Sequence, residues 1–176
     1  MKYCKDCKES FEPIKKFNST LSTNRCEVCL KTAEALKNLA SIKKEKKIKQ
    51  KEDLLTLQDY LKMTQQVFNS WIRQRDKGLN CISCDKPCKK ENAGHYFSSG
   101  GHANVRFDEN NVHLQCEYCN TFLHGNLILY GVNLEKKIGK DEFIILREKA
   151  YEVKKFTKIE LKELLLKYKA KLKDVS

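Results

Sequence analysis

The sequence contains no hydrophobic run that approaches the roughly 18 to 20 residues needed to span a bilayer. Its first residues, Met1-Lys2-Tyr3-Cys4, also lack the apolar stretch that a signal peptide requires. Both absences argue against a membrane protein and against a secreted one. We therefore expect a cytoplasmic protein that has no membrane partner.

Acidic residues are scarce relative to basic ones. The chain of 176 residues has 23 Asp and Glu against 35 Lys and Arg, a formal net charge of +12. This excess favours a polyanionic partner, most often nucleic acid, although basic ribosomal and membrane-surface proteins share the bias. The length corresponds to one compact domain with an extension, or to two small domains.

Cysteine, in contrast, is abundant. A disulfide framework would favour an export signal and an even cysteine count, whereas this chain lacks the signal and has nine cysteines. Two thiolates separated by two residues suit tetrahedral zinc, because the short loop lets both sulfurs converge on one ion. We expect two structural zinc sites, formed by four CxxC pairs: Cys4 and Cys7, Cys26 and Cys29, Cys81 and Cys84, Cys116 and Cys119. Cys88 is left over and is expected to be a bystander, although it could replace one ligand.

The N-terminal region, residues 1–32, is predicted to be a zinc knuckle that needs metal to fold. Its small core could use only Phe11, Ile14, Phe17 and Leu21. Residues 33–56 are predicted to be a basic helical linker. The stretch 31–51 has eight Lys and two Glu, and could be either a solvated helix or linker, or an arm that contacts phosphates.

An amphipathic helix is predicted to begin at residue 57, with Thr56 as N-cap, Asp59 at the third position and Gly78 at the end. Two further helices are predicted over 141–155 and 158–173, the second opening with a capping box at Thr157 and Glu160. Residues 156–176 then form a basic C-terminal helix. The apolar stripes of the first and last helices are core or dimer faces: Leu57, Tyr60, Leu61, Val67, Phe68, Trp71 and Ile72, and Leu161, Leu164, Leu165, Tyr168 and Leu172.

Residues that could carry chemistry concentrate between Cys81 and Asn126, where all four His and five of the nine Cys lie. This segment contains Ala93-Gly94-His95-Tyr96 and, later, Asn111-Val112-His113-Leu114-Gln115-Cys116-Glu117-Tyr118-Cys119-Asn120. A His, then an Asn, then CxxC-Asn between zinc knuckles resembles the HNH, or ββα-metal, nucleases. The resemblance implies an α+β fold with a zinc-stapled, treble-clef-like nuclease centre, in a domain spanning residues 57–155.

The resemblance assigns a role to each matching residue. His95 corresponds to the general base, and an ordinary His pKa near 6.5 suits proton abstraction around neutral pH. Asn111 corresponds to the loop Asn that supports the hairpin and the base. Asn120 corresponds to a helix position that binds catalytic magnesium or manganese, and His124 to a second metal position on the same helix face. His102 and His113 receive no role.

One position departs from the nuclease pattern. Many such enzymes have a metal-binding Asp or His immediately before the base, whereas this chain has Gly94. The missing ligand could be a water molecule or one of four side chains: Glu91, Asn92, Asp108 or His113.

A closer resemblance, over about residues 54–150, is to the NinG/Rap recombination proteins of lambdoid phages. It is carried by Ala93-Gly94-His95-Tyr96, by the run from Val105 to His113 and by Gln115-Cys116-Glu117-Tyr118-Cys119-Asn120. It implies a structure-selective endonuclease, in a phage-infected bacterium, that cleaves branched DNA such as D-loops and Holliday junctions. A Gly before the His recurs in this family.

Two other functions are compatible with the residues. The chain could be a non-catalytic, zinc-dependent DNA-binding or recombination accessory protein, or an HNH nuclease that cuts ordinary duplex DNA. For a junction nuclease we expect a homodimer on DNA, because two symmetric cuts need two His95 centres and two-fold dimers are the commonest oligomers.

Overall fold

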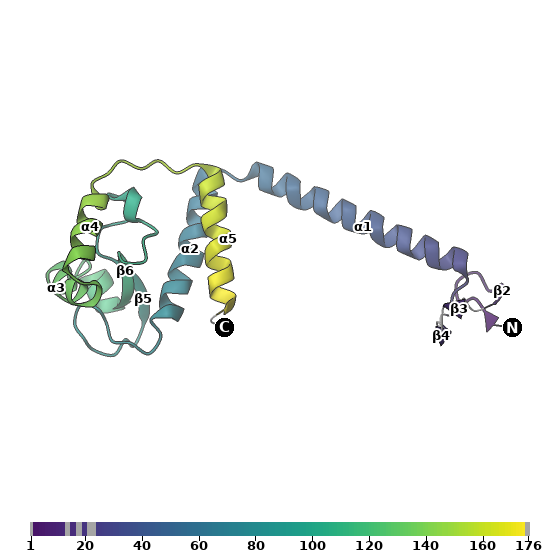
Figure 1. Ribbon diagram of the computed structural model, residues 1–176, viewed down its shortest axis with the longest axis horizontal. Coiled ribbons are helices and arrows are strands. Elements are labelled where there is room, and N and C mark those ends of the chain that lie inside the picture. Colours follow the sequence, from purple (N-terminus) through teal and green to yellow (C-terminus); the bar gives the residue numbers. More distant parts are fainter. Residues whose placement is uncertain (1, 13–14, 17–18, 21–23, 175–176) are drawn as a thin grey trace. The chain divides into compact units, whose positions relative to one another are not determined.

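The computed structural model describes residues 2–12, 15–16, 19–20 and 24–174 (Figure 1). It combines helices with three small two-stranded sheets, so the predicted α+β class is confirmed. The chain divides into two compact units, Met1–Leu55 and Thr56–Ser176.

The first unit has two short antiparallel pairs followed by a long helix. Strand β1 (Lys2–Tyr3) pairs with β2 (Ser10–Phe11), and β3 (Lys15–Lys16) pairs with β4 (Ser19–Thr20). Of the four predicted core residues, Phe11 is partly buried. Ile14, Phe17 and Leu21 lie outside the described residues.

Helix α1 (Glu27–Leu54) contains the Lys-rich stretch, which is therefore helical. The stretch contains no Gly or Pro to interrupt the helix, and Glu27 forms an i,i+4 ion pair with Lys31 at 2.7 Å. None of the 28 residues of α1 is buried, so the helix projects its lysines into solvent.

The second unit is built on two helices that pack side by side, α2 (Leu57–Arg75) and α5 (Lys158–Asp174) (Figure 1). The predicted N-cap Thr56 forms a capping box with Asp59, and the predicted capping box of Thr157 and Glu160 also forms. The rings of Phe68 on α2 and Tyr168 on α5 meet edge to face, with centroids 4.7 Å apart. The two apolar stripes thus pack against each other as core faces, which is one of the two uses expected of them.

A β-hairpin lies against α2. Strand β5 (Glu91–His95) pairs antiparallel with β6 (Val112–Cys116), and His95 is opposite Val112. A 3₁₀ turn (Ala103–Val105) lies in the loop between them, and a π-helical turn (Tyr118–Phe122) follows β6.

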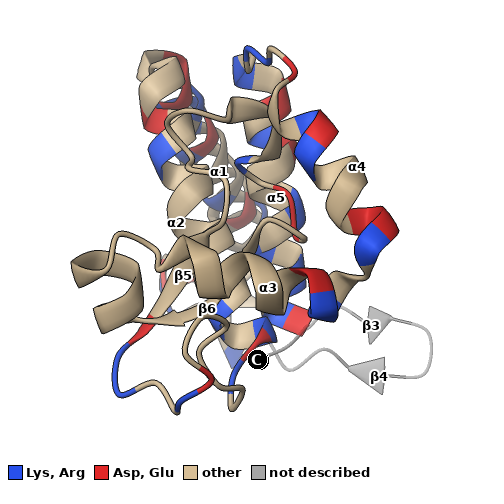
Figure 2. Cartoon of the chain, turned by 90° about the vertical axis from the view of Figure 1, so that its left-hand side faces the viewer, with Lys and Arg blue, Asp and Glu red and all other residues tan. Residues whose placement is uncertain are grey.

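Helices α3 (Leu127–Ile138) and α4 (Lys140–Ala150) cover the hairpin loop. Helix α4 ends at Ala150, five residues before the end of the helix predicted over 141–155. Acidic and basic residues alternate along α4 (Figure 2). A second core joins these helices to the loop and contains Val105, Tyr130, Leu134, Leu146 and Ala150.

Candidate functional site

The first cysteine group brings the predicted ligands of the N-terminal unit together. The thiols of Cys4, Cys7, Cys26 and Cys29 lie within 4.8 Å of one another, and the sulfurs of Cys7 and Cys26 are 3.7 Å apart. Four sulfurs bound tetrahedrally to zinc at about 2.3 Å are about 3.8 Å apart. This group therefore fits a zinc ion.

The second group lies at the base of the hairpin. Cys81 and Cys84 follow α2, Cys116 ends β6 and Cys119 lies in the π-helical turn; their thiols are also within 4.8 Å of one another. The sulfurs of Cys84 and Cys116 are 3.9 Å apart, which again fits tetrahedral zinc. Cys88 is not part of this cluster.

His95, the predicted base, lies at the end of β5 with its Nε2 atom 3.1 Å from the carbonyl oxygen of Arg106. A carbonyl oxygen can only accept, so Nε2 carries the proton and Nδ1 keeps its lone pair. Burial lowers the pKa of His95 below its ordinary value, and the Arg106 carbonyl only partly opposes this. The ring is therefore neutral at pH 7 and can accept a proton.

His95 and His124 line one cavity of about 300 Å³. His124 is exposed, and no hydrogen bond to its ring is found within the described part of the chain. The full lining is His95, Tyr96, Phe97, Ser98, His102, His124 and Leu127, so Asn120 is not among the lining residues.

The expectation that Asn120 and His124 share a helix face is wrong. The π-helical turn ends at Phe122, and His124 has φ +49°, in the left-handed region. Gly125 and Asn126 also have positive φ. Because the chain leaves the helical conformation before His124, the i,i+4 relation does not hold there.

Asn111 is fully buried and closes the loop that follows His95. Its Oδ1 accepts from the N–H of Phe97 at 2.8 Å, and its Nδ2 donates to the carbonyls of Phe97 and Val105 at 3.0 and 2.9 Å. Three hydrogen bonds of this side chain thus hold the loop between β5 and β6 in its conformation.

The four candidates for the missing metal ligand do not line the cavity. Glu91 is at the opposite end of β5 from His95. Asp108 binds Lys149 at 2.6 Å. Successive side chains of a strand point to opposite faces, and His95 and its partner Val112 share one face of the hairpin. Asn92, three residues before His95, and His113, next to Val112, therefore point to the other face.

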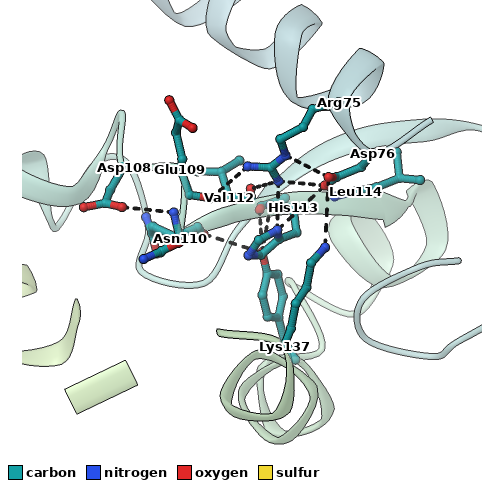
Figure 3. Close-up of polar contacts among 12 residues, drawn as sticks. Arg75, Asp76, Asp108, Glu109, Asn110, Val112, His113, Leu114 and Lys137 are labelled. Carbon is teal, nitrogen blue, oxygen red and sulfur yellow. Dashed lines mark hydrogen bonds and ion pairs between the residues drawn. The ribbon is translucent and has the colours of Figure 1, made fainter. Parts of the chain in front are cut away.

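His113 instead belongs to a buried polar cluster at the end of α2 (Figure 3). The Arg75 guanidinium donates to Asp76 at 2.8 Å and to His113 Nδ1 at 2.8 Å, and Leu114 N–H donates to Asp76 at 2.9 Å. Burial would raise the pKa of Asp76, but the hydrogen bonds and charge of Arg75 and the N–H of Leu114 hold it well below its ordinary value. Lys137 of α3 lies 4.0 Å from the same carboxylate. The cluster therefore links α2, β6 and α3, and no motif in the sequence indicated it.

His102 also reaches the cavity, although the sequence assigned it no role. Its Nδ1 lies 3.0 Å from the carbonyl of Ala150 and its ring contacts those of Phe97 and Tyr151. These contacts attach the hairpin loop to the end of α4.

The cavity lining offers imidazole nitrogens and a Ser98 hydroxyl but no carboxylate. Magnesium prefers oxygen ligands, whereas imidazole suits transition ions. His124 thus offers the cavity an exposed imidazole, and no carboxylate oxygen of the kind that magnesium prefers lines it.

Comparison with known proteins identifies the family. A family model described as Bacteriophage Lambda NinG protein matches residues 1–176. The chain belongs to the NinG family. Three NinG relatives, each named Protein ninG, come from Escherichia phage lambda, Escherichia phage 933W and Salmonella phage P22. Each is 38% identical to this chain, over 117, 117 and 120 residues respectively.

Each of these alignments covers 66% of this chain and 57 or 58% of the NinG relative. The chain thus spans less than two thirds of the length of the curated NinG proteins that it matches. No solved structure matches this NinG chain. Among its described residues, no helix is both long and apolar enough to cross a membrane.

Proposed function

We propose that this NinG-family protein is a DNA endonuclease that hydrolyses phosphodiester bonds in branched recombination intermediates such as Holliday junctions and D-loops. The observation that carries the proposal is the shared cavity of His95 and His124, with His95 in the tautomer that leaves Nδ1 free. The net charge of +12 supports a polyanionic substrate.

In the proposed reaction, Nδ1 of His95 takes the proton of the water molecule that attacks the phosphorus. The Arg106 carbonyl holds the ring in the required tautomer, and Asn111 holds the loop on which Arg106 lies. His124 would bind the divalent ion, which when bound stabilises negative charge on the phosphate and the leaving oxygen. Asn120 does not line the cavity, so the prediction that it binds the divalent ion needs a variant of its own, Asn120→Ala.

The test compares the wild type with His95→Ala and His95→Gln on matched linear duplex, D-loop and four-way junction substrates, with magnesium or manganese supplied. A general base contributes typically 10² to 10⁴-fold, so both variants should cleave slower by about that factor. Zinc content and junction binding should stay unchanged, because the one hydrogen bond of the His95 ring to the described part of the chain is to a backbone carbonyl. Cleavage by His95→Ala at the wild-type rate would overturn the assignment.

The same substrates separate the alternative functions. Tight junction binding with no cleavage by the wild type would identify a non-catalytic accessory protein. Equal cleavage of linear duplex and junction would identify a nuclease for ordinary DNA. Asn120→Ala, if Asn120 contributes to ion binding, should lose activity that raised manganese partly restores.

Two symmetric cuts in a junction need two His95 centres, so the proposal includes a homodimer on DNA. The predicted stripes of α2 and α5 pack against each other, so a dimer would have to use other apolar side chains. Exposed apolar side chains remain on α3 at Ile128, Leu129 and Val132. Light scattering of the free and the junction-bound protein measures the stoichiometry, and one chain per junction would exclude the dimer.

A further inference from the structure

A second hollow, of about 430 Å³, lies beside the zinc-fitting group of the hairpin. Two aromatic side chains of the π-helical turn line it, Tyr118 and Phe122, and they remain 63% and 65% exposed. Their ring centroids are 6.2 Å apart and the ring planes are inclined by 34°. Large rings usually lie mostly buried, so an exposed pair on one turn indicates a surface that takes a partner.

Positive charge surrounds the two rings. Lys86, Lys89 and Lys90 also line the hollow. Lys90 forms an ion pair with Glu117. Lys86 and Lys89 are exposed, and their ammonium groups have no acidic partner among the described residues. The rim is therefore basic and able to contact phosphates.

The hollow and the His95 cavity are lined by residues that are close in sequence. Leu123 lines the hollow and Leu127 lines the cavity, so the short turn that contains His124 separates them. A DNA strand held with a phosphate beside His124 would bring a neighbouring nucleotide to this turn.

We propose that Tyr118 and Phe122 form a platform on which an unpaired base of DNA stacks, while Lys86 and Lys89 contact the flanking phosphates. An aromatic ring can stack on any base, but a base inside a duplex has both faces covered by its neighbours. A D-loop contains a displaced single strand, whose bases are free to stack. This inference rests on the proposed function. The unpaired base would be the feature by which the protein distinguishes branched DNA from ordinary duplex DNA.

The rings and the lysines contribute differently. Phosphates are present in paired and unpaired DNA alike, so the lysines add affinity for both. Stacking on a free base is available only in unpaired DNA and is worth about 5- to 150-fold in affinity per base. The preference for unpaired DNA must therefore depend on the rings.

The experiment measures binding without cleavage, using the full zinc-loaded chain with magnesium and manganese omitted. The probe is a short oligodeoxynucleotide containing 2-aminopurine, either single-stranded or annealed to its complement. Anisotropy gives the affinity, and quenching of 2-aminopurine fluorescence reports stacking directly. The variants are Tyr118→Ala, Phe122→Ala, the conservative Phe122→Trp, and Lys86→Gln with Lys89→Gln. Tyr3→Ala is the matched control, since Tyr3 is 70% exposed in the other unit.

We expect each ring-to-Ala variant to lose about 5- to 150-fold affinity for the single strand, together with the quenching, and to bind the duplex unchanged. Phe122→Trp should keep both signals, and the lysine variant should weaken binding to both probes. Equal losses on both probes, or wild-type quenching in Tyr118→Ala and Phe122→Ala, would overturn the platform. Because no cleavage is measured, a protein that quenches the probe but never cuts DNA would refute the nuclease and leave the platform standing.

Discussion

The side-chain oxygen Oε1 of Gln115 lies 2.1 Å from the point that a Cβ atom on Gly94 would occupy. Gln115 is fully buried and cannot easily withdraw, because its Nε2 donates to Ser83 Oγ at 2.6 Å and to the Gly125 carbonyl at 2.5 Å. The glycine before His95 is therefore required by packing. A metal-binding Asp or His has no room at position 94 in this arrangement.

Gly94→Ala should therefore destabilise the protein by about 1 to 3 kcal/mol, the usual range for overpacking a core. In a Gln115→Ala background the same substitution should cost less, since Oε1 and Cδ are gone and only the Cβ atom of residue 115, at 2.9 Å, stays close. Denaturant unfolding at a fixed zinc concentration measures both penalties. An equal penalty in the two backgrounds would contradict the packing explanation.

Local sequence signals were sufficient for the helices that carry them. Thr56 with Asp59, and Thr157 with Glu160, begin α2 and α5 as predicted, because a capping box satisfies backbone donors within four residues. The CxxC spacing likewise predicted which cysteines converge, since each pair needs only one tight turn.

Contacts between residues that are distant in the chain could not be predicted from such local signals. The Gln115 bond to Ser83 joins residues 32 positions apart, and the Arg75 bond to His113 joins residues 38 apart. The place of His124 also depended on backbone conformation, because three consecutive residues with positive φ end the helical path that the spacing implied. The sequence thus pointed to His95 and His124, which line one cavity, but not to the place of Asn120 outside that cavity or of His102 within it.

Metal-replete protein should contain two zinc ions per chain, one for each group of four cysteines. Cys116→Ser should remove one zinc and unfold the hairpin region, because Cys116 joins the end of β6 to the loop after α2. Cys88→Ser is the matched control and should keep both ions. Elemental analysis and circular dichroism provide the measurements; one zinc or none in the wild type would refute the prediction.

The lysines of α1 should raise the affinity for DNA by an amount that grows with the number of phosphates they contact. Replacing Lys43, Lys44, Lys46 and Lys47 by Gln leaves the helix intact, because no residue of α1 is buried. Each lost phosphate contact should reduce the slope of log affinity against log salt by about 0.9 for duplex DNA. An unchanged slope would mean that α1 acts only as a spacer.

Asp76→Asn should destabilise the second unit by about 3 kcal/mol, because it removes the charge that balances Arg75 in a buried cluster. Asp108→Asn provides a control: this residue also pairs with a cation, Lys149, but that pair is partly exposed. Its loss should cost less than about 1 kcal/mol. Similar effects of the two substitutions would argue against a structural role for the Asp76 cluster.

The pH dependence of cleavage should report the state of His95. Burial lowers the pKa of His95, so the ring stays neutral, and competent as a base, at pH values where an ordinary histidine is already protonated. As the pH falls through this lowered pKa, kcat/KM should decrease about tenfold per unit, with a midpoint below about 6.5. Junction affinity and zinc content, measured at each pH, separate loss of the base from loss of binding or of fold. A midpoint at or above the ordinary histidine value, with binding and zinc intact, would mean that the partly buried ring of His95 is not the group that accepts the proton.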